Sequence, residues 1–383
     1  MPSRARALSC LACASRDEYH TRRPTTTLPA DTSRAWLDVD LDALLANART
    51  VASISGSRLL PMVKANGYGI GAVAVARALE SLDPWGFGVA SVEEGAELRR
   101  GGVQRPILVV SPLVPDWIEG CLAYDLRPSI GDLLALEAWS RQSQRPFHVE
   151  IDTGMSRAGL RWDDTAALSA LRAHLSSAPG WEGLFTHFLF AESDVDITIR
   201  QWDRFQMVLQ SLPRPRLVHA ANSAAALRGR AFAGDMVRPG IFLYGGLAGH
   251  PVPRSVVSLH ARVIGTRSIA AGDTVGYGAG WQAEQPGVIA TIAVGYADGF
   301  PRAGASGRVR EIEINGKTVP VVGRVTMDMC MALVDSSVRI GDVATIFGGA
   351  ISLDQQAAAA GTISYELLTR LGSRLPRRYQ RSA

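Results

Sequence analysis

The stretch LLPMVKANGYGIG, residues 59–71, joins an apolar run, typical of a buried strand, to a glycine-rich turn and the start of a helical pattern. It carries Lys64, one of only two lysines in the chain. The other, Lys317, follows Asn315-Gly316, a pair that favours a tight hairpin turn facing solvent. A buried lysine can lose its proton and condense with an aldehyde, whereas an arginine cannot. Lys64 ends a predicted strand, where α/β folds place their chemistry, and is therefore the candidate for Schiff-base chemistry. A plain strand-end lysine is the alternative.

The region from about residue 34 alternates apolar runs with helix-compatible connections. A short strand is expected over 35–39 and a helix over 41–52. The apolar runs that follow lie at residues 59–65, 86–91, 106–111, 125–130, 147–152, 181–188, 216–222 and 236–245. Such a repeat is what a (β/α)8 barrel requires, although an open doubly wound sheet gives the same pattern.

The pattern changes after about residue 256, where β-rich segments alternate with Gly and Asp turns. The fold prediction is therefore an α/β protein with a (β/α)8 TIM-type barrel over residues 34–256, followed by a mostly β C-terminal domain over 257–383. The segment before them, residues 1–33, is rich in Arg, Ser and Thr and lacks periodicity. We expect a disordered N-terminal extension there, with an export signal as the lesser alternative.

The composition excludes several classes of protein. A chain of 383 residues suits two domains with sizeable cores, and no apolar run approaches the ~20 residues of a membrane span. The net charge of +4 comes from the ends: residues 1–33 contribute +2 and residues 371–383 contribute +4, which leaves −2 for the rest. This distribution argues against a nucleic-acid groove. Of the four cysteines only Cys10 and Cys13 lie close together, so no zinc or disulfide framework is expected, and a reducing compartment fits.

Polar side chains gather at the ends of the predicted barrel strands. They are Lys64, Asp152, Arg157, His187, Asn222, Ser223, Arg238 and, as a backbone donor, Gly240. In a barrel all of these ring one mouth. A pocket with one lysine, one histidine, two arginines and small donors suits an anionic cofactor that carries a phosphate.

Nine motifs along the chain resemble, in the same order, the alanine racemase family, pyridoxal-phosphate enzymes that combine a barrel with a β domain. They are VKANGYG (63–69), IDTGMSR (151–157), THF (186–188), ANS (221–223), VRPGIFLYG (237–245), VGYG (275–278), GYADG (295–299), GRVTMDM (323–329) and SYELLTRL (364–371). Each motif is weak alone. Nine in register across both predicted domains are specific.

The resemblance implies two catalytic residues. Lys64 would hold pyridoxal 5'-phosphate covalently and act as one acid/base at the substrate α-carbon, and Tyr277, from the other subunit, would act on the opposite face. His187 and Arg238 would form a hydrogen-bonded chain with Tyr277 that lowers its pKa. Taken alone, Tyr277 also fits a turn residue between two glycines, and His187 fits a core histidine.

Arg238 is the most diagnostic residue, because the resemblance places it against the pyridine nitrogen of the cofactor. An arginine does not give up its proton, so the nitrogen stays neutral and return of a proton to the α-carbon is favoured over transamination. A surface arginine before Pro239 is the alternative reading.

The resemblance also assigns binding residues. The phosphate contacts would come from Tyr68, Ser223, Tyr365 and the backbone N–H groups of Gly240 and Ile241. The substrate carboxylate would bind Arg157 and the backbone of the partner's Met327. Tyr365 and Tyr296 would narrow the entrance, which favours a side chain no larger than methyl.

One position departs from the family pattern. Seven residues before Arg157, many members carry a carbamylated lysine, whereas this chain has Glu150. We hypothesise that Glu150 supplies the negative charge directly. An outward-facing strand residue is the alternative.

The expected function is therefore pyridoxal-phosphate-dependent interconversion of L- and D-alanine by a homodimer in the cytoplasm, which supplies D-alanine for peptidoglycan. No metal, nucleic acid or membrane is expected. Serine or a broader range of amino acids is the alternative substrate. A related barrel decarboxylase is disfavoured because no Cys-centred signature surrounds Cys330, and a non-catalytic carrier would be a single shorter barrel without Tyr277.

Overall fold

The protein is described by a computed structural model in which residues 32–304 and 306–381 are placed. The extension predicted over residues 1–33 lies almost wholly outside the described residues. The chain from Arg34 onward forms one compact unit. Among the described residues, no helix is both long and apolar enough to cross a membrane.

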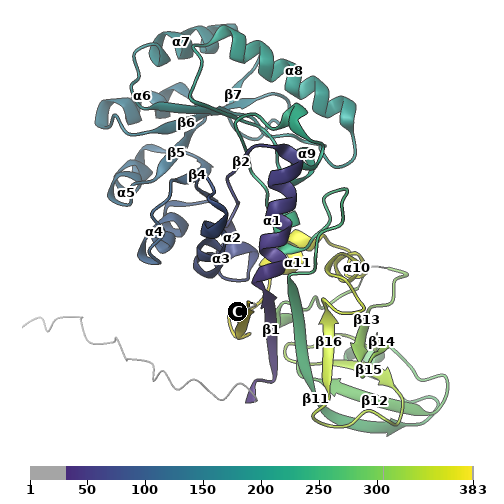
Figure 1. Cartoon of the computed structure of the whole chain (residues 1–383). Coiled ribbons are helices and arrows are strands. Elements are labelled where there is room, and N and C mark those ends of the chain that lie inside the picture. The colour runs from purple at the N-terminus through teal and green to yellow at the C-terminus, as the bar shows by residue number, and fades with distance from the viewer. Residues whose placement is uncertain (1–31, 305, 382–383) are drawn as a thin grey trace, which may run out of the picture. The chain divides into compact units, whose positions relative to one another are not determined.

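A parallel barrel fills the first part of this unit (Figure 1). Each predicted apolar run overlaps one strand: β2 (Arg58–Leu59), β3 (Phe87–Val89), β4 (Ile107–Pro112), β5 (Arg127–Ile130), β6 (Phe147–Asp152), β8 (Trp181–Phe185), β9 (Leu217–His219) and β10 (Met236–Val237). A short strand, β7 (Leu160–Arg161), pairs with β6. Strands β3, β4, β5, β6, β8 and β9 form a curled parallel sheet in that order, and β10 pairs with β2.

The ring closes through backbone hydrogen bonds between these two sheets. The amide of Val63, after β2, donates to the carbonyl of Gly88 in β3, and the amide of Asp235, before β10, donates to the carbonyl of Val218 in β9. An open doubly wound sheet would leave two unpaired edges, so the barrel prediction is confirmed and the open sheet is excluded.

Helices follow the barrel strands in the chain, and Figure 1 shows α4 to α8 outside the curled sheet. They are α3 (Ala72–Leu79), α4 (Val92–Arg100), α5 (Ile118–Ala123), α6 (Leu133–Gln142), α7 (Thr165–Leu175), α8 (Val195–Ser211) and α9 (Ser223–Leu227); α1 (Leu41–Ser55) precedes β2. All of them except α3 and α5 start at a capping side chain that accepts an otherwise unpaired amide. Asp132, for example, accepts from Ala135 at 2.8 Å, and Asp194 accepts from Ile197 at 2.9 Å.

The second part is a closed antiparallel barrel. Its strands are β11 (Val257–Ile269), β12 (Gly287–Ile292), β13 (Glu311–Ile314), β14 (Lys317–Val322), β15 (Cys330–Val334) and β16 (Val343–Phe347), joined in the order β12, β15, β14, β13, β16, β11, with β11 also paired to β12. The hairpin predicted at Asn315-Gly316 is present, since Ile314 pairs with Lys317 and both turn residues have positive φ. The mostly β second domain is therefore confirmed as a fold class.

The strand predicted over 35–39 forms, as β1 (Ala35–Asp40), but it pairs away from the parallel barrel. It lies antiparallel to β11 and parallel to β17 (Arg377–Gln380). Both partners are more than 200 residues away in the chain, and local periodicity carries no information about such a pairing. Two helices, α10 (Leu353–Ala359) and α11 (Ser364–Thr369), complete the fold.

Candidate active site

Lys64 begins a left-handed turn, α2 (Lys64–Tyr68). Its residues 65 to 68 have φ between 52° and 60°, a conformation that costs a non-glycine residue about 1–2 kcal/mol. Glu94 of α4 holds this turn, because Oε1 accepts from the amide of Ala65 and Oε2 from the amide of Ala90, both at 2.7 Å. Strained backbone persists only where its surroundings fix it. These bonds therefore fix the backbone conformation directly after Lys64.

A cavity of about 490 Å³ lies at the carboxyl ends of the parallel strands, within the usual size range of small-molecule sites. It is lined by most of the residues that the sequence singled out: Lys64, Tyr68, Arg157, His187, Ser223, Arg238, Gly240, Ile241 and Tyr365. These residues come from both ends of the chain. The fold therefore brings them together as the barrel prediction requires.

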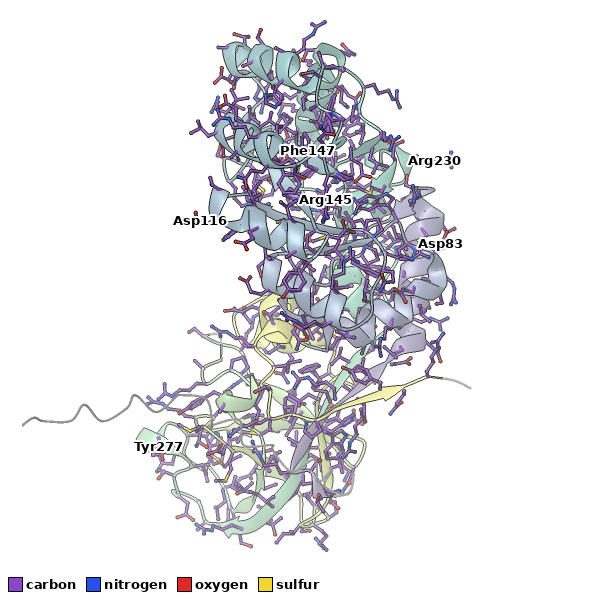
Figure 2. The ribbon with its side chains drawn as sticks, turned by 90° about the vertical axis from the view of Figure 1, so that its left-hand side faces the viewer. Asp83, Asp116, Arg145, Phe147, Arg230 and Tyr277 are labelled. Atoms are coloured by element: carbon purple, nitrogen blue, oxygen red, sulfur yellow. The ribbon has the colours of Figure 1, made fainter. Side chains whose placement is uncertain are left out.

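Tyr277 and Met327, which were predicted to act in a partner's cavity, do not line the cavity of this single chain. Tyr277 is 70% exposed and lines a different hollow, beside β11 and β12, and Figure 2 shows it at the outer edge of the β domain. Met327 is 53% exposed. The sequence analysis assigned both to the cavity of a partner subunit, which stays a prediction.

Lys64 lies near two positively charged side chains, Arg157 and Arg238. Burial lowers the pKa of Lys64, and the positive charges of Arg157 and Arg238 act in the same direction, while Glu94 raises it. An amine in this setting gives up its proton more readily than an exposed lysine does. Lys64 therefore has the property that condensation with an aldehyde requires.

Arg238 is buried, and both of its terminal nitrogens lie within hydrogen-bond distance of acceptors. Its Nη1 lies 2.6 Å from Nδ1 of His219, and its Nη2 donates to the carbonyls of Thr186 (2.8 Å) and Ala220 (2.9 Å). Burial lowers the pKa of Arg238 to about 10, which leaves the guanidinium charged at neutral pH. With only 4% of its surface exposed, Arg238 is not the surface arginine of the alternative reading.

His187 also faces Arg238, with its Nδ1 3.2 Å from Nη2 of the arginine. Because a guanidinium only donates, Nδ1 of His187 must accept. Burial lowers the pKa of His187 well below its ordinary value, and the charges of Arg238, Arg157 and Lys64 lower it further. The ring is therefore neutral and carries its proton on Nε2.

Hydroxyl groups and closely packed backbone form another part of the cavity lining. Tyr68 stacks on Tyr244, with ring centroids 4.4 Å apart, and Ser223 Oγ accepts from the amide of Gly240 at 2.8 Å. Any side chain at Gly240 would overlap the Tyr68 hydroxyl. Burial raises the pKa of Tyr68 and of Tyr365, so both phenols keep the proton that they could donate to an anion. This wall fits a phosphate group.

Glu150 projects into the same cavity from β6 and is 5% exposed. Its Oε2 has no hydrogen-bond partner among the residues that the structure describes. Burial raises the pKa of Glu150, and the charges of Arg238 and Arg157 oppose that shift. The outward-facing alternative is therefore excluded by the burial of this side chain.

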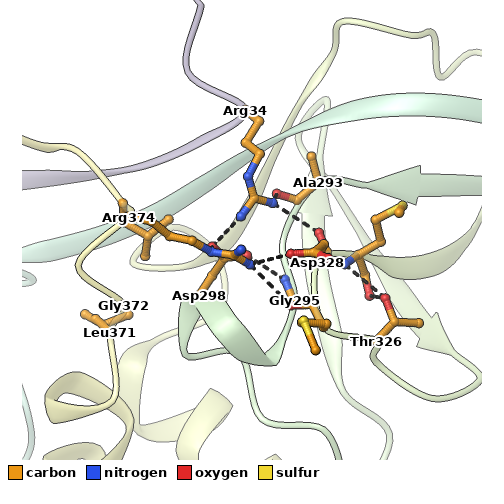
Figure 3. A network of polar contacts seen from close by, with 12 residues as sticks. Arg34, Ala293, Gly295, Asp298, Thr326, Asp328, Leu371, Gly372 and Arg374 are labelled. Carbon is orange, nitrogen blue, oxygen red and sulfur yellow. Dashed lines mark hydrogen bonds and ion pairs between the residues drawn. The ribbon is translucent and has the colours of Figure 1, made fainter. Parts of the chain in front are cut away.

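The loop that carries Tyr296 and Asp298 is tied to the loop that carries Met327 and Asp328 by Arg34 and Arg374, which each bond to both loops (Figure 3). Asp298 is fully buried and accepts from Arg34 Nη2 at 2.6 Å and Arg374 Nε at 2.7 Å. The carbonyl of Met327 accepts from the amide of residue 297 at 3.0 Å. This network holds both loops in one arrangement, although they lie about 30 residues apart in the chain.

Several residues that shape the site were missed from the sequence. They are Glu94, Phe185, Glu192, His219 and Tyr244. Tyr244 donates to the carbonyl of Met62 at 2.8 Å, and Tyr365 donates to Glu192 at 3.3 Å. His219 stood in a quoted apolar run, but a single histidine in a strand gives no sign of its partner.

Comparison with known proteins agrees with this geometry. The family model described as "Alanine racemase, N-terminal domain" matches residues 39–248, and that described as "Alanine racemase, C-terminal domain" matches residues 256–379. The chain belongs to the alanine racemase family. Together the two matches span both barrels, so family membership rests on the whole fold and not on the Lys64 motif alone.

Individual relatives support the same assignment. The alanine racemase of Symbiobacterium thermophilum is 38% identical over 367 residues, covering 90% of this chain and 96% of that protein. The alanine racemase structure from Bartonella henselae, with covalently bound pyridoxal phosphate, is 30% identical with a TM-score of 0.83 and covers 91% of this chain and 100% of that one. That from Bacillus anthracis, with bound L-Ala-P, is 32% identical with a TM-score of 0.82 and covers 91% and 95%. The chain is thus an enzyme of this family.

Proposed function

We propose that this chain interconverts L-alanine and D-alanine with pyridoxal 5'-phosphate bound covalently at Lys64. The observation that carries the proposal is the convergence, in one cavity, of a lysine of lowered pKa, a buried charged arginine and a wall of hydroxyl groups. The names of the relatives and the cofactor in the Bartonella henselae structure support it.

The residues fit this cofactor. Lys64 would form the covalent link, Arg238 would face the ring nitrogen, and the hydroxyls of Tyr68, Ser223 and Tyr365 with the amides of Gly240 and Ile241 would bind the phosphate. When bound, the cofactor withdraws electrons from the α-carbon of the amino acid and so makes its proton easier to remove. Arg238 stays charged at neutral pH, and therefore cannot act as the base that takes a proton from the substrate.

The proton is moved by two residues on opposite faces of the α-carbon. Lys64 would take or return it on one face, and Tyr277 of a second copy on the other. Arg157 would hold the substrate carboxylate together with the amide of Met327 from the second copy. We therefore propose a homodimer in which the β domain, residues 257–383, completes the partner's cavity, while residues 34–256 bind the cofactor.

The proposed cellular role is the supply of D-alanine for peptidoglycan in the cytoplasm. A second candidate is a racemase of serine or of a broader range of amino acids. The residues that would limit the size of the substrate side chain are Ile363, which is exposed, and Tyr365, both of which line the cavity. Initial rates with L-serine, measured beside L-alanine, distinguish the two.

The direct test follows the α-proton. Purified protein with pyridoxal phosphate and L-alanine in D₂O is followed by proton NMR, and D-alanine is quantified on a chiral column, beside Lys64→Ala and Tyr277→Phe. D-alanine that appears with the parent protein and is lost in both variants supports the two-residue mechanism. Exchange without inversion would refute the role of Tyr277, and absence of any exchange would refute the proposed function.

A further inference from the structure

A line of hydrogen bonds crosses the interior of the parallel barrel, starting from Arg238 at the cavity. Nδ1 of His219 lies 2.6 Å from Arg238, and Nε2 of His219 lies 2.8 Å from Nδ1 of His148 in β6. Nε2 of His148 lies 3.3 Å from Oε2 of Glu182, which also accepts from Nε of Arg127 at 2.7 Å. We call these five residues the relay. It ends at Glu182 and Arg127, at the start of β8 and β5, on the barrel face opposite the cavity.

The two histidines of the relay are fully buried, whereas Glu182 and Arg127 are partly exposed to solvent. His148 and His219 are 0% exposed, whereas the side chains of Glu182 and Arg127 are 15% and 17% exposed. Burial lowers the pKa of both histidines, so neither ring carries a charge at neutral pH. The charged groups around them are Arg238, Arg127 and Glu182.

The proton positions follow from which atoms can donate. A guanidinium has no acceptor, so Nδ1 of His219 accepts from Arg238 and the proton of His219 lies on Nε2. Nδ1 of His148 must then accept, which leaves the proton of His148 on Nε2. That proton is donated to the carboxylate of Glu182. The three bonds that link Arg238, His219, His148 and Glu182 therefore all point toward the carboxylate, and Arg127 donates to the same carboxylate from the other side.

The backbone is shaped to allow this arrangement. His148 in β6 reaches His219 in β9 across the strand between them, β8, at Gly183, where any Cβ would overlap the His148 ring. The register shifts at this point, since residue 147 pairs with Trp181 and His148 with Gly183, so that Glu182 is an extra residue on β8. Such a bulge can redirect a side chain, and here Glu182 is bonded to His148.

We propose that Glu182 is a positioning residue for Arg238, acting through the two buried imidazoles. Its carboxylate, held by Arg127, fixes the tautomer of His148, and His148 fixes that of His219. His219 then always presents an acceptor to Arg238. With the opposite tautomers, two N–H groups would face each other 2.6 Å apart and the guanidinium would be pushed from its place at the cavity. The consequence for catalysis rests on the proposed role of Arg238, whereas the tautomers do not.

The tautomers are tested first, in full-length protein labelled with [15N]histidine, with and without pyridoxal phosphate. Long-range proton–nitrogen correlation spectra at pH 7.5 distinguish the two neutral tautomers and the imidazolium. His148 and His219, identified by the signals missing from His148→Gln and His219→Gln, are expected to carry their protons on Nε2. An Nδ1–H tautomer or an imidazolium at either position would overturn the proposal.

The effect on the site is tested with Glu182→Gln, which keeps the size but can turn a donor toward His148, and with Gly183→Ala, which displaces the ring. Glu137→Gln is the matched control, because Glu137 pairs with Arg141 at 3.0 Å on the exposed surface of α6. We expect mixed tautomer signals at His219 and a kcat for alanine lowered by roughly 3- to 30-fold in Glu182→Gln, with a smaller change in KM.

The outcomes separate a positioning role from a structural one. Unchanged tautomers and kcat in Glu182→Gln, with only a lower melting temperature, would show that Glu182 merely stabilises the barrel and would refute the proposal. If the parent protein does not racemise alanine, the proposed function fails, yet the tautomer spectra of parent and Glu182→Gln still decide whether the relay exists. Should Gly183→Ala fail to fold, Glu182→Gln alone remains decisive.

Discussion

The amide of Ala65 donates a 2.7 Å hydrogen bond to Oε1 of Glu94. This bond ties the residue after Lys64 to the helix that follows the next strand, and the other oxygen of the same carboxylate accepts from Ala90. The left-handed turn that begins at Lys64 is thus supported by a side chain about 30 residues further along the chain. The direction of the lysine depends on that carboxylate as much as on its own sequence.

Replacing Glu94 by Ala should therefore weaken both the turn and the site. Two amides lose their acceptor, which we expect to lower the free energy of unfolding by about 1–3 kcal/mol. Because Glu94 raises the pKa of Lys64, its loss should lower that pKa further. Urea unfolding measures the change in the free energy of unfolding. The pH dependence of cofactor binding measures the change in the pKa of Lys64. Glu97→Ala, on the exposed side of the same helix, is the control; equal behaviour of the two variants would contradict this account.

The shared site predicts complementation between two inactive variants. Lys64→Ala lacks the amine and Tyr277→Phe lacks the hydroxyl, but a mixed dimer would contain one cavity with both groups. A one-to-one mixture that exchanges subunits should recover about one quarter of the parent activity, since half of the dimers are mixed and each has one intact site. The measurement is racemisation against time after mixing. A mixture that stays inactive, although subunit exchange is verified, would show that Tyr277 does not act across the dimer.

Glu150→Gln tests whether the carboxylate balances the two arginines of the cavity. Removing its charge should raise KM for alanine by about 3- to 10-fold, which corresponds to ~1 kcal/mol, because the neighbouring negative charge would no longer orient the guanidinium of Arg157 toward the substrate carboxylate. Cofactor content, read from absorbance, should remain at the parent level. Steady-state kinetics at fixed pH provides the test, and identical KM and kcat in parent and variant would rule out a role for this charge.

The buried histidines predict a loss of stability in mild acid. The fold lowers the pKa of His148, His187 and His219. Below about pH 6.5 the unfolded chain takes up protons that the folded chain does not. The free energy of unfolding therefore decreases as the pH falls below about 6.5. Each group contributes up to about 1.4 kcal/mol per pH unit.

Glu150 acts with the opposite sign, because its raised pKa removes stability as pH rises above its ordinary value of about 4.5. The three histidines outnumber it in the window from pH 6.5 to 5. Urea midpoints at pH 7.5, 6.0 and 5.0 should therefore decrease steadily. A midpoint that stays constant over this range would mean that the histidines are not buried as neutral rings.

The sequence by itself determined the repeat and most of the chemistry. Each apolar run predicted from 59–65 to 236–245 contains part of a barrel strand, because buried parallel strands read as continuous apolar segments. The Asn315-Gly316 turn formed because both residues tolerate positive φ. The scarcity of lysine pointed to Lys64, and local motifs supplied many of the other residues that line the cavity.

Only the tertiary structure decided which distant groups meet. The pairing of β1 with β11, the support of Lys64 by Glu94, and the relay from Arg238 to Glu182 join segments that have no periodic relation in the chain. The relay also depends on one extra residue in β8 and on the missing side chain of Gly183. The register of paired strands and the close approach of the His148 ring to Gly183 depend on how separate strands pack. No local sequence pattern predicts them.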